Sequence, residues 1–332
     1  MKKSEAMVLL EGAFERERLL YRSKQTYREC VRRFLRETVW TGQSAEDAVC
    51  AFLSSHAANW AAATQSQYLN AVVFFFRHAL NRPLGEMPGW VRAEKANRLP
   101  VWLTHEEALA VLGQMRDPNR LVCELMYGSG FRISEVTRLR RKDVNWRELT
   151  MVVRDGKGAK DRVTCLPVSL VDRLRAQDEY AEGLWKQDRA RGVDPVWQPD
   201  AVARKYPKRG LEAGEYWLFP AGALARGAQW GNVRYHVHPD TLAKAIPQAT
   251  KRAGVLKHVK AHVFRHSFAT EYLQNGGAIH ELQALLGHTT IETPQIYLHC
   301  LPRLAARITS PLDRKPSNVV EFAQPEPLRR AV

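Results

Sequence analysis

Apolar residues recur with helical spacing through the first 90 residues of the chain. After Ser23, a candidate N-cap, one apolar stripe follows the i, i+3, i+4, i+7, i+8 spacing of a helix: Tyr27, Cys30, Val31, Phe34 and Leu35. Ser44 with Asp47 is the capping signal of a second helix, and a capping box of Thr64 and Gln67 precedes a third. We therefore predict that residues 1–90 form a helical domain.

From residue 102 onward, helical and strand patterns alternate. A capping box from Thr104 to Glu107 predicts a helix. Further helices are expected over 121–127 and 171–183. In residues 149–154 and 163–168 apolar and polar positions alternate, as they do in β-strands. A glycine-rich turn lies between them, which is the pattern of a hairpin. The expected fold class is mainly α with a small antiparallel β-sheet (α+β) in the C-terminal domain.

Prolines and glycines mark the boundary between the two domains. Pro83, Gly85, Pro88 and Gly89 interrupt the helical pattern, and basic residues follow as far as Pro100. The predicted division is an N-terminal domain over 1–90, a basic linker over 91–101, a C-terminal domain over 102–311 with an insertion at about 184–220, and a tail over 312–332.

The charge of the chain indicates its class of partner. There are 50 Lys and Arg against 35 Asp and Glu, a net charge of +15. Such an excess favours a polyanion, and nucleic acid is the common one. One face of the first striped helix carries a basic row that we expect to lack balancing acids: Lys24, Arg28, Arg32, Arg33 and Arg36. A phosphate backbone suits this row better than a merely solvated helix face does.

Several other classes of protein are disfavoured. No apolar run approaches a membrane span, and the charged start does not fit a signal peptide, so the cytoplasm is expected. The five cysteines include no C-x-x-C pair, which argues against a zinc site or a disulfide framework. Two histidine pairs, His236 with His238 and His262 with His266, have no accompanying carboxylate or cysteine, so no metal is expected.

The densest candidate chemistry lies between residues 262 and 297, in H-V-F-R-H-S-F-A-T, L-L-G-H and I-Y-L-H. His262 and Arg265 are spaced i, i+3 and would share one helix face. Gly287 is a candidate helix C-cap, which places His288 in the turn after it. Thr293 and Pro294 predict the start of a helix that carries Tyr297. Taken singly, each residue is as well explained by packing or surface pairing.

Together these side chains suit nucleophilic attack on a phosphodiester. A phenol is a poor nucleophile while protonated, and nearby cations favour its phenolate. Guanidinium groups match the charge that spreads over the phosphate oxygens. Arg132 follows two glycines in G-S-G-F-R-I-S-E and is a candidate anion clamp. One lysine or histidine must then protonate the leaving oxygen. Lys157, at the predicted hairpin tip, can reach into a groove, and Lys160 is its nearby competitor for any catalytic role.

The region from Trp185 to Pro220 is unusually rich in aromatic and basic residues. They include Trp197, Arg204, Lys205, Tyr206, Lys208, Arg209, Tyr216 and Trp217. One interpretation is an insertion folded over a hydrophobic patch. The other is an aromatic surface for unpaired bases, which stack on such rings for about 1–3 kcal/mol each.

These positions resemble the tyrosine recombinase family in order and spacing: Arg132, Lys157, His262, Arg265, His288 and Tyr297. The resemblance spans nearly the whole chain, and the insertion Q-P-D-A-V-A-R-K-Y-P-K-R-G followed by Y-W-L-F-P-A resembles the integron integrase branch. It implies that Arg132 and Arg265 clamp the scissile phosphate with help from His262 and His288. Lys157 would protonate the leaving 5′ oxygen, and Tyr297 would form a 3′-phosphotyrosyl link.

The resemblance also implies a two-domain clamp on DNA, with a helical core-binding domain and a catalytic domain. Its partners would be duplex sites and folded single-stranded hairpins with extrahelical bases, bound by a homo-tetramer without metal or other cofactor. DNA contacts are expected from Lys24, Arg28, Arg32, Lys160, Trp217 and His236. The chain departs from the family pattern at Phe131, Glu292, Pro294 and Leu298.

Three alternative functions stay open at this point. The chain is either an integron-type enzyme or an Xer- or phage-type recombinase on duplex sites. A type IB topoisomerase-like enzyme would use the same chemistry to relax supercoils. A DNA-binding relative without catalytic activity would explain the charge alone.

Overall fold

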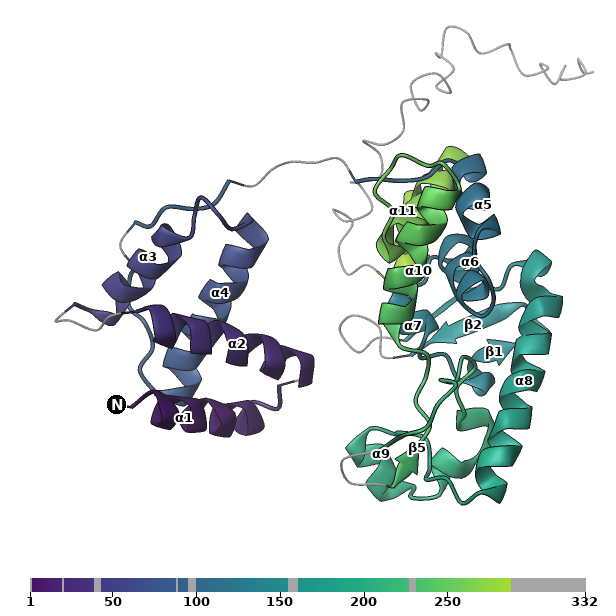
Figure 1. Cartoon of the computed structure of the whole chain (residues 1–332), viewed down its shortest axis with the longest axis horizontal. Helices are drawn as coiled ribbons and strands as arrows, with labels where there is room; N and C mark the ends of the chain where they lie inside the picture. Colours follow the sequence, from purple (N-terminus) through teal and green to yellow (C-terminus); the bar gives the residue numbers. More distant parts are fainter. Residues whose placement is uncertain are drawn as a thin grey trace, which may run out of the picture. The chain divides into compact units, whose positions relative to one another are not determined.

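The computed structural model describes residues 2–19, 21–38, 43–87, 89–94, 100–154, 161–226 and 231–287. The chain divides into two compact units, Met1–Arg98 and Leu99–Val332. Figure 1 shows that the first unit is helical and that the second combines helices with short strands. No helix in these ranges has the length and apolar character that crossing a bilayer requires.

The described residues of the N-terminal unit form four α-helices: α1 (Lys3–Arg16), α2 (Tyr21–Glu37), α3 (Ala45–Ser55) and α4 (Ala62–Phe74), which continues as the π-helix η1 (Phe75–Ala79). Their apolar faces form one core that includes Leu10, Phe14, Val31, Phe34, Phe52 and Phe75. Ser44 caps α3 by accepting a hydrogen bond from the Asp47 N–H at 3.0 Å, which confirms the predicted start. Two predicted starts are wrong, because α2 already begins at Tyr21 and α4 at Ala62.

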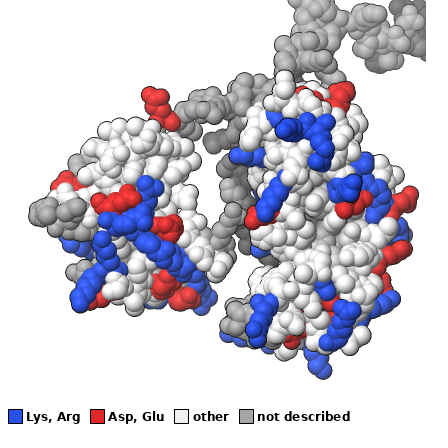
Figure 2. Space-filling model, viewed as in Figure 1, with Lys and Arg blue, Asp and Glu red and all other residues white. Residues whose placement is uncertain are grey.

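The surface of this unit is not uniformly basic. Figure 2 shows Lys and Arg side chains beside Asp and Glu side chains on the face in view. The ion pairs that produce this mixture are described with the candidate site below.

The C-terminal unit contains most of the elements. Its α-helices are α5 (His105–Gly113), α6 (Asn119–Ser129), α7 (Ile133–Val136), α8 (Val171–Ala190), α9 (Asp200–Lys205), α10 (Pro239–Arg252), α11 (Ala261–Gln274) and α12 (Ile279–Leu286). Short 3-10 helices are η2 (Arg141–Asp143), η3 (Val168–Leu170), η4 (Arg209–Leu211) and η5 (Ala213–Glu215). Thr104 caps α5 in a capping box with Glu107, as predicted.

The part of this unit that the structure describes also contains two small antiparallel sheets. The strands β1 (Val144–Asn145), β2 (Thr150–Val153) and β3 (Arg162–Cys165) are ordered β1-β2-β3, and β4 (Ala225–Arg226) pairs with β5 (Asn232–Val233). In the β2–β3 ladder Met151 lies opposite Thr164, and Val153 lies opposite Arg162. The predicted mainly α fold with a small antiparallel sheet is confirmed, although both strands of the hairpin are shorter than expected.

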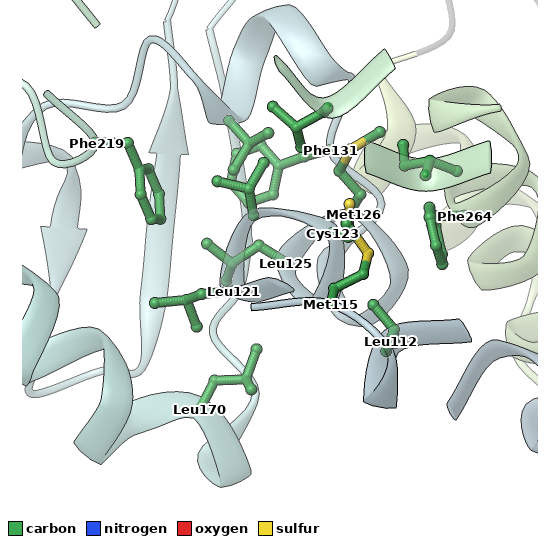
Figure 3. Packing of buried hydrophobic residues seen from close by; sticks show 14 of the residues in the cluster. Leu112, Met115, Leu121, Cys123, Leu125, Met126, Phe131, Leu170, Phe219 and Phe264 are labelled. Atoms are coloured by element: carbon green, nitrogen blue, oxygen red, sulfur yellow. The ribbon is translucent and has the colours of Figure 1, made fainter. Parts of the chain in front are cut away.

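A hydrophobic core joins α5, α6, α10 and α11 to the β1–β2–β3 sheet. Figure 3 shows Phe131 and Phe264 among the apolar side chains of this core, together with Cys123 and Met126 of α6. Phe131 is completely buried. The aromatic ring before Arg132 therefore has a packing role, and it anchors the segment that leads to Arg132.

The insertion is folded onto the unit by a buried polar network. α8 extends to Ala190, beyond its predicted end at residue 183, and carries Asp188 into the interior. Asp188 accepts two hydrogen bonds from Arg234, at 2.6 and 2.7 Å, and a third from the Tyr216 hydroxyl at 2.5 Å. Figure 1 shows α8 running from beside the sheet to the part of the unit that holds α9 and β5.

Candidate active site

Helix α11 carries two of the predicted catalytic residues, His262 and Arg265. The Arg265 side chain is 4% exposed. Its Nη1 donates to the Gly130 carbonyl at 2.5 Å, and its Nη2 donates to the Leu286 carbonyl at 2.6 Å. This one guanidinium therefore connects α11 both to the segment before Arg132 and to the end of α12.

The backbone that precedes Arg132 holds this residue close to Arg265. Gly130 ends α6 in the left-handed region at φ +70°, and Arg132 is the N-cap of α7. A Cβ at Gly130 would meet the Phe268 ring at 2.7 Å and Leu286 at 2.8 Å, so both its φ and its packing require glycine. The Arg132 side chain remains 19% exposed, which leaves it in contact with solvent beside the buried Arg265.

A single carboxylate, Glu135, contacts both predicted phosphate-binding arginines. Its side chain is 7% exposed. Its oxygens accept hydrogen bonds from Arg132 Nη1 at 2.6 Å and from two nitrogens of Arg162 at 2.9 and 2.6 Å. Arg265 Nη1 lies 3.7 Å from Oε2 of the same group. The arginines therefore converge on Glu135.

Glu135 stays ionised in this environment. Burial opposes its ionisation, but the hydrogen bonds and charge of Arg162, and then those of Arg132, outweigh burial and lower the pKa of Glu135 to about 2. Sequence reasoning did not single out Glu135. Its only local signal is its position three residues after Arg132, at the N3 position of α7, where it also accepts the Arg132 backbone N–H at 2.8 Å.

His262 is a neutral imidazole near these arginines. Burial is the largest cause of the lowered pKa of His262, followed by the positive charges of Arg265 and Arg132. Its neighbour His266, with ring centroids 6.2 Å apart, has a pKa lowered to about 4 by burial and by the charges of His262 and Arg265. At pH 7 His262 can therefore both donate and accept a hydrogen bond.

The other predicted catalytic residues, Lys157, His288 and Tyr297, lie outside the described residues, as does Lys160. Elements next to them in sequence are described. In sequence, β2 ends before residues 155–160 and β3 begins after them, and Gly287 is the C-cap of α12 with φ +64°, which confirms the predicted C-cap. Within the described ranges no group of three or more histidine, cysteine or acidic side chains is placed to hold a metal ion.

The basic row of α2 has acidic partners, so the expectation that it lacks balancing acids is wrong. Lys24 pairs with Glu15 of α1, and Arg28 pairs with Glu11 of α1, each at 2.5 Å. Arg32 pairs with Glu29 at 2.9 Å. Arg33 and Arg36 share Glu37. For these side chains to bind phosphate, they must exchange carboxylate partners for DNA.

The aromatic residues of the insertion divide into buried and exposed groups. Trp217 is 3% exposed, with Arg140 Cζ 4.4 Å from its ring centroid and the His236 ring against its edge. Trp217 is largely covered by these neighbours, and the expected DNA contacts of Trp217 and His236 stay predictions. Trp197 and Tyr206 are each 48% exposed and are better placed for such a contact.

Trp197 borders a pocket of about 220 Å³ beside α7. Its lining includes Ser134, Glu135, Arg138, Gln198 and Val202. Among the described residues, the buried Gln198 Nε2 has no hydrogen-bond partner. The pocket therefore combines an aromatic wall, a cation and a polar group, and it shares Glu135 with the two arginines.

Comparisons with known proteins agree with this geometry. Residues 101–303 match the phage integrase family, and residues 9–86 match the phage integrase N-terminal SAM-like domain. An integrase/recombinase of Escherichia coli is 37% identical over 312 residues, which cover 91% of this chain and 92% of that protein. Tyrosine recombinase XerA of Thermococcus onnurineus is 32% identical over 206 residues, 60% of this chain and 58% of the relative.

Solved structures show the same fold. The Tn1549 transposon integrase in complex with transposon right end DNA has a TM-score of 0.60 at 14% identity, and covers 90% of this chain and 99% of its own. The XerH recombinase in a post-cleavage complex has a TM-score of 0.56 at 22% identity, with 86% and 79% covered. The family match and the relatives show an enzyme that cleaves and rejoins DNA at specific sites. The chain belongs to the phage integrase family, the tyrosine recombinases.

Proposed function

We propose that this recombinase is an integron integrase that cuts DNA through Tyr297. The Tyr297 hydroxyl releases its proton to solvent, and the phenolate, which nearby cations favour, attacks the scissile phosphorus. The bond from phosphorus to the 5′ oxygen breaks, and Lys157 supplies the proton to that oxygen. The product is a 3′-phosphotyrosyl ester and a free 5′ hydroxyl. A 5′ hydroxyl from another strand then attacks the ester and releases the tyrosine. Because the ester conserves the bond energy, the exchange requires neither nucleotide hydrolysis nor a metal.

The observation that carries the proposed chemistry is the convergence of Arg132 and Arg265 on Glu135. Attack on a phosphodiester spreads negative charge over the non-bridging oxygens, and positioned guanidinium groups stabilise that charge. Arg265 is fixed by two backbone carbonyls, and Arg132 is fixed by a carboxylate while part of its side chain meets solvent. Neutral His262 next to both arginines, with His288, would add hydrogen bonds to the same phosphate.

For the substrate, we propose folded single-stranded hairpins as well as duplex sites, bound by a homo-tetramer. The pocket beside Trp197 supports this proposal. A volume of about 220 Å³ is enough for one unpaired base, which would stack on Trp197 and accept a hydrogen bond from Gln198 Nε2. Because Glu135 lines this pocket, a base held there would sit close to the phosphate-binding arginines.

A matched pair of variants tests this substrate. Trp197→Ala and Tyr206→Ala each remove an aromatic ring that is 48% exposed, and Trp197 lines the pocket whereas Tyr206 is not among its lining residues. Stacking of about 1–3 kcal/mol corresponds to roughly 5- to 150-fold in binding. We expect Trp197→Ala to reduce recombination of a folded single strand at least fivefold and to change duplex recombination less than twofold. Equal losses on both substrates, or an equal loss in Tyr206→Ala, would count against a base-binding pocket.

The second candidate is an Xer- or phage-type recombinase that acts on duplex sites alone. It is favoured by the relatives named tyrosine recombinase XerA and XerD and by the structures bound to duplex recombination sites. Wild-type protein that recombines duplex sites but not folded single strands would establish this alternative.

A further inference from the structure

Arg162, the first residue of β3, contacts both the carboxylate that binds Arg132 and the last turn of α12. Its side chain is 8% exposed. Nη1 and Nη2 donate to the two oxygens of Glu135 at 2.9 and 2.6 Å, and Nε donates to the Leu285 carbonyl at 2.8 Å. All three guanidinium nitrogens are therefore used, two on the carboxylate that binds Arg132 and one on α12.

The contact with α12 satisfies a specific need of that helix. The last carbonyls of a helix have no partner within the helix, and cations are favoured at this negative end. Arg162 binds the Leu285 carbonyl, while Arg265 binds the Leu286 carbonyl. The end of α12 is thus held by two arginines, and both of them also contact Glu135.

Arg162 also packs on the residue that ends α12. A Cβ at Gly287 would lie 3.0 Å from Arg162 Cδ and 3.5 Å from its Nε and Nη1. Gly287 is at φ +64°, and the next residue in the chain is His288. A shift of Arg162 would therefore act on the backbone immediately before His288 and on the carboxylate that holds Arg132.

We propose that Arg162 is a positioning residue for DNA cleavage. It holds the Glu135–Arg132 pair and the end of α12 in one fixed geometry, and it does so without contacting the DNA. This inference rests on the proposed phosphate clamp. It requires the planar three-nitrogen geometry of arginine, because a lysine is a point charge that cannot bind both carboxylate oxygens and a carbonyl at once.

The test compares Arg162→Lys with Arg141→Lys in the full chain. Arg141 is a matched control, since its side chain is 12% exposed and its Nε and Nη2 bind Asp178 and Glu182 away from the candidate site. Each protein is bound in excess to a duplex suicide substrate, and three quantities are measured: the dissociation constant, the single-turnover rate of covalent adduct formation, and the unfolding midpoint.

We expect Arg162→Lys to lower the adduct rate at least 30-fold and to change the dissociation constant less than threefold. Arg141→Lys should change the adduct rate and the dissociation constant less than threefold each, even if its unfolding midpoint is lowered. A wild-type rate in Arg162→Lys would overturn the inference. An equal rate loss in Arg141→Lys, or a parallel loss of DNA affinity in Arg162→Lys, would also overturn it. If the wild-type chain forms no adduct, the proposed chemistry fails first and the role of Arg162 with it.

A modified substrate separates the phosphate clamp from proton delivery. Arg162 lies five residues after Lys157 in the sequence, so its loss could instead act on the leaving group. In a 5′-bridging phosphorothiolate the sulfur leaves as a thiolate and needs no proton. We expect the Arg162→Lys defect to persist within threefold on this substrate. If the defect disappears on this substrate, Arg162 acts on proton delivery to the leaving oxygen, which would contradict our proposal.

Discussion

Replacing Glu135 by glutamine tests whether one carboxylate holds the three arginines together. Ionised Glu135 has a pKa of about 2 against an ordinary value of 4.5, so at pH 7 its ionisation stabilises the folded state by about 3 kcal/mol. Removing one partner of a buried ion pair typically costs about 3–5 kcal/mol, because the remaining charge is left uncompensated. Glutamine cannot replace the bidentate contact with Arg162, so we expect a loss in this range.

Differential scanning calorimetry of the full chain measures this loss. In a unit of this size each kcal/mol of lost stability lowers the melting temperature by about 2–4 °C, so the transition of residues 99–332 should fall by roughly 6–20 °C. Glu182→Gln is the control, since Glu182 is an exposed carboxylate that also binds an arginine, Arg141, and it should leave the midpoint unchanged within error. The Glu135→Gln adduct rate should also fall at least tenfold. A variant with the wild-type midpoint and adduct rate would refute the role assigned to Glu135.

Three further predictions follow from the described contacts. Asp188→Asn removes a fully buried charge from Arg234 and should destabilise the fold by about 3–5 kcal/mol in calorimetry; an unchanged midpoint would show that the network is dispensable. His266, with a pKa of about 4 when folded and about 6.5 when unfolded, binds more protons in the unfolded state, so stability should fall as pH drops from 6.5 toward 4. Urea unfolding at pH 7, 5.5 and 4.5 should show a weaker fall for His266→Gln, and equal pH profiles would contradict this. Arg28→Gln removes one expected phosphate contact and should flatten the log–log salt dependence of DNA binding by about 0.9, and an unchanged slope would mean that Arg28 does not reach phosphate.

The parts of the fold that depend on local chemistry were predictable from the sequence. Ser44 and Thr104 begin helices, because their side chains accept the N–H groups of the first turn. Gly287 ends a helix, because glycine adopts the left-handed conformation freely. The signals at Ser23 and Thr64 failed, because the helices extend past them to Tyr21 and Ala62. A capping residue shows where a helix can begin, but packing of the preceding turn against other helices decides whether it does.

The contacts within the site were only partly predictable. The spacing of His262 and Arg265 placed them correctly on one helix. The roles of Glu135 and Arg162 depend on contacts among α7, β3 and α12. These elements are far apart in the sequence, so no local pattern predicts their contacts. The acids that neutralise the basic row of α2 were missed for the same reason, because Glu11 and Glu15 lie on another helix.

The most direct test of the account is to identify the residue that becomes linked to DNA. A duplex suicide substrate traps the adduct, and mass spectrometry of the digested complex locates the nucleotide on a peptide. Tyr272→Phe is the control, since this tyrosine lies on α11 with His262 and Arg265 but its hydroxyl binds Glu281 at 2.7 Å. We predict a link to Tyr297, its loss in Tyr297→Phe with DNA binding retained, and its persistence in Tyr272→Phe. An adduct on any other residue, or one that survives in Tyr297→Phe, would contradict the mechanism.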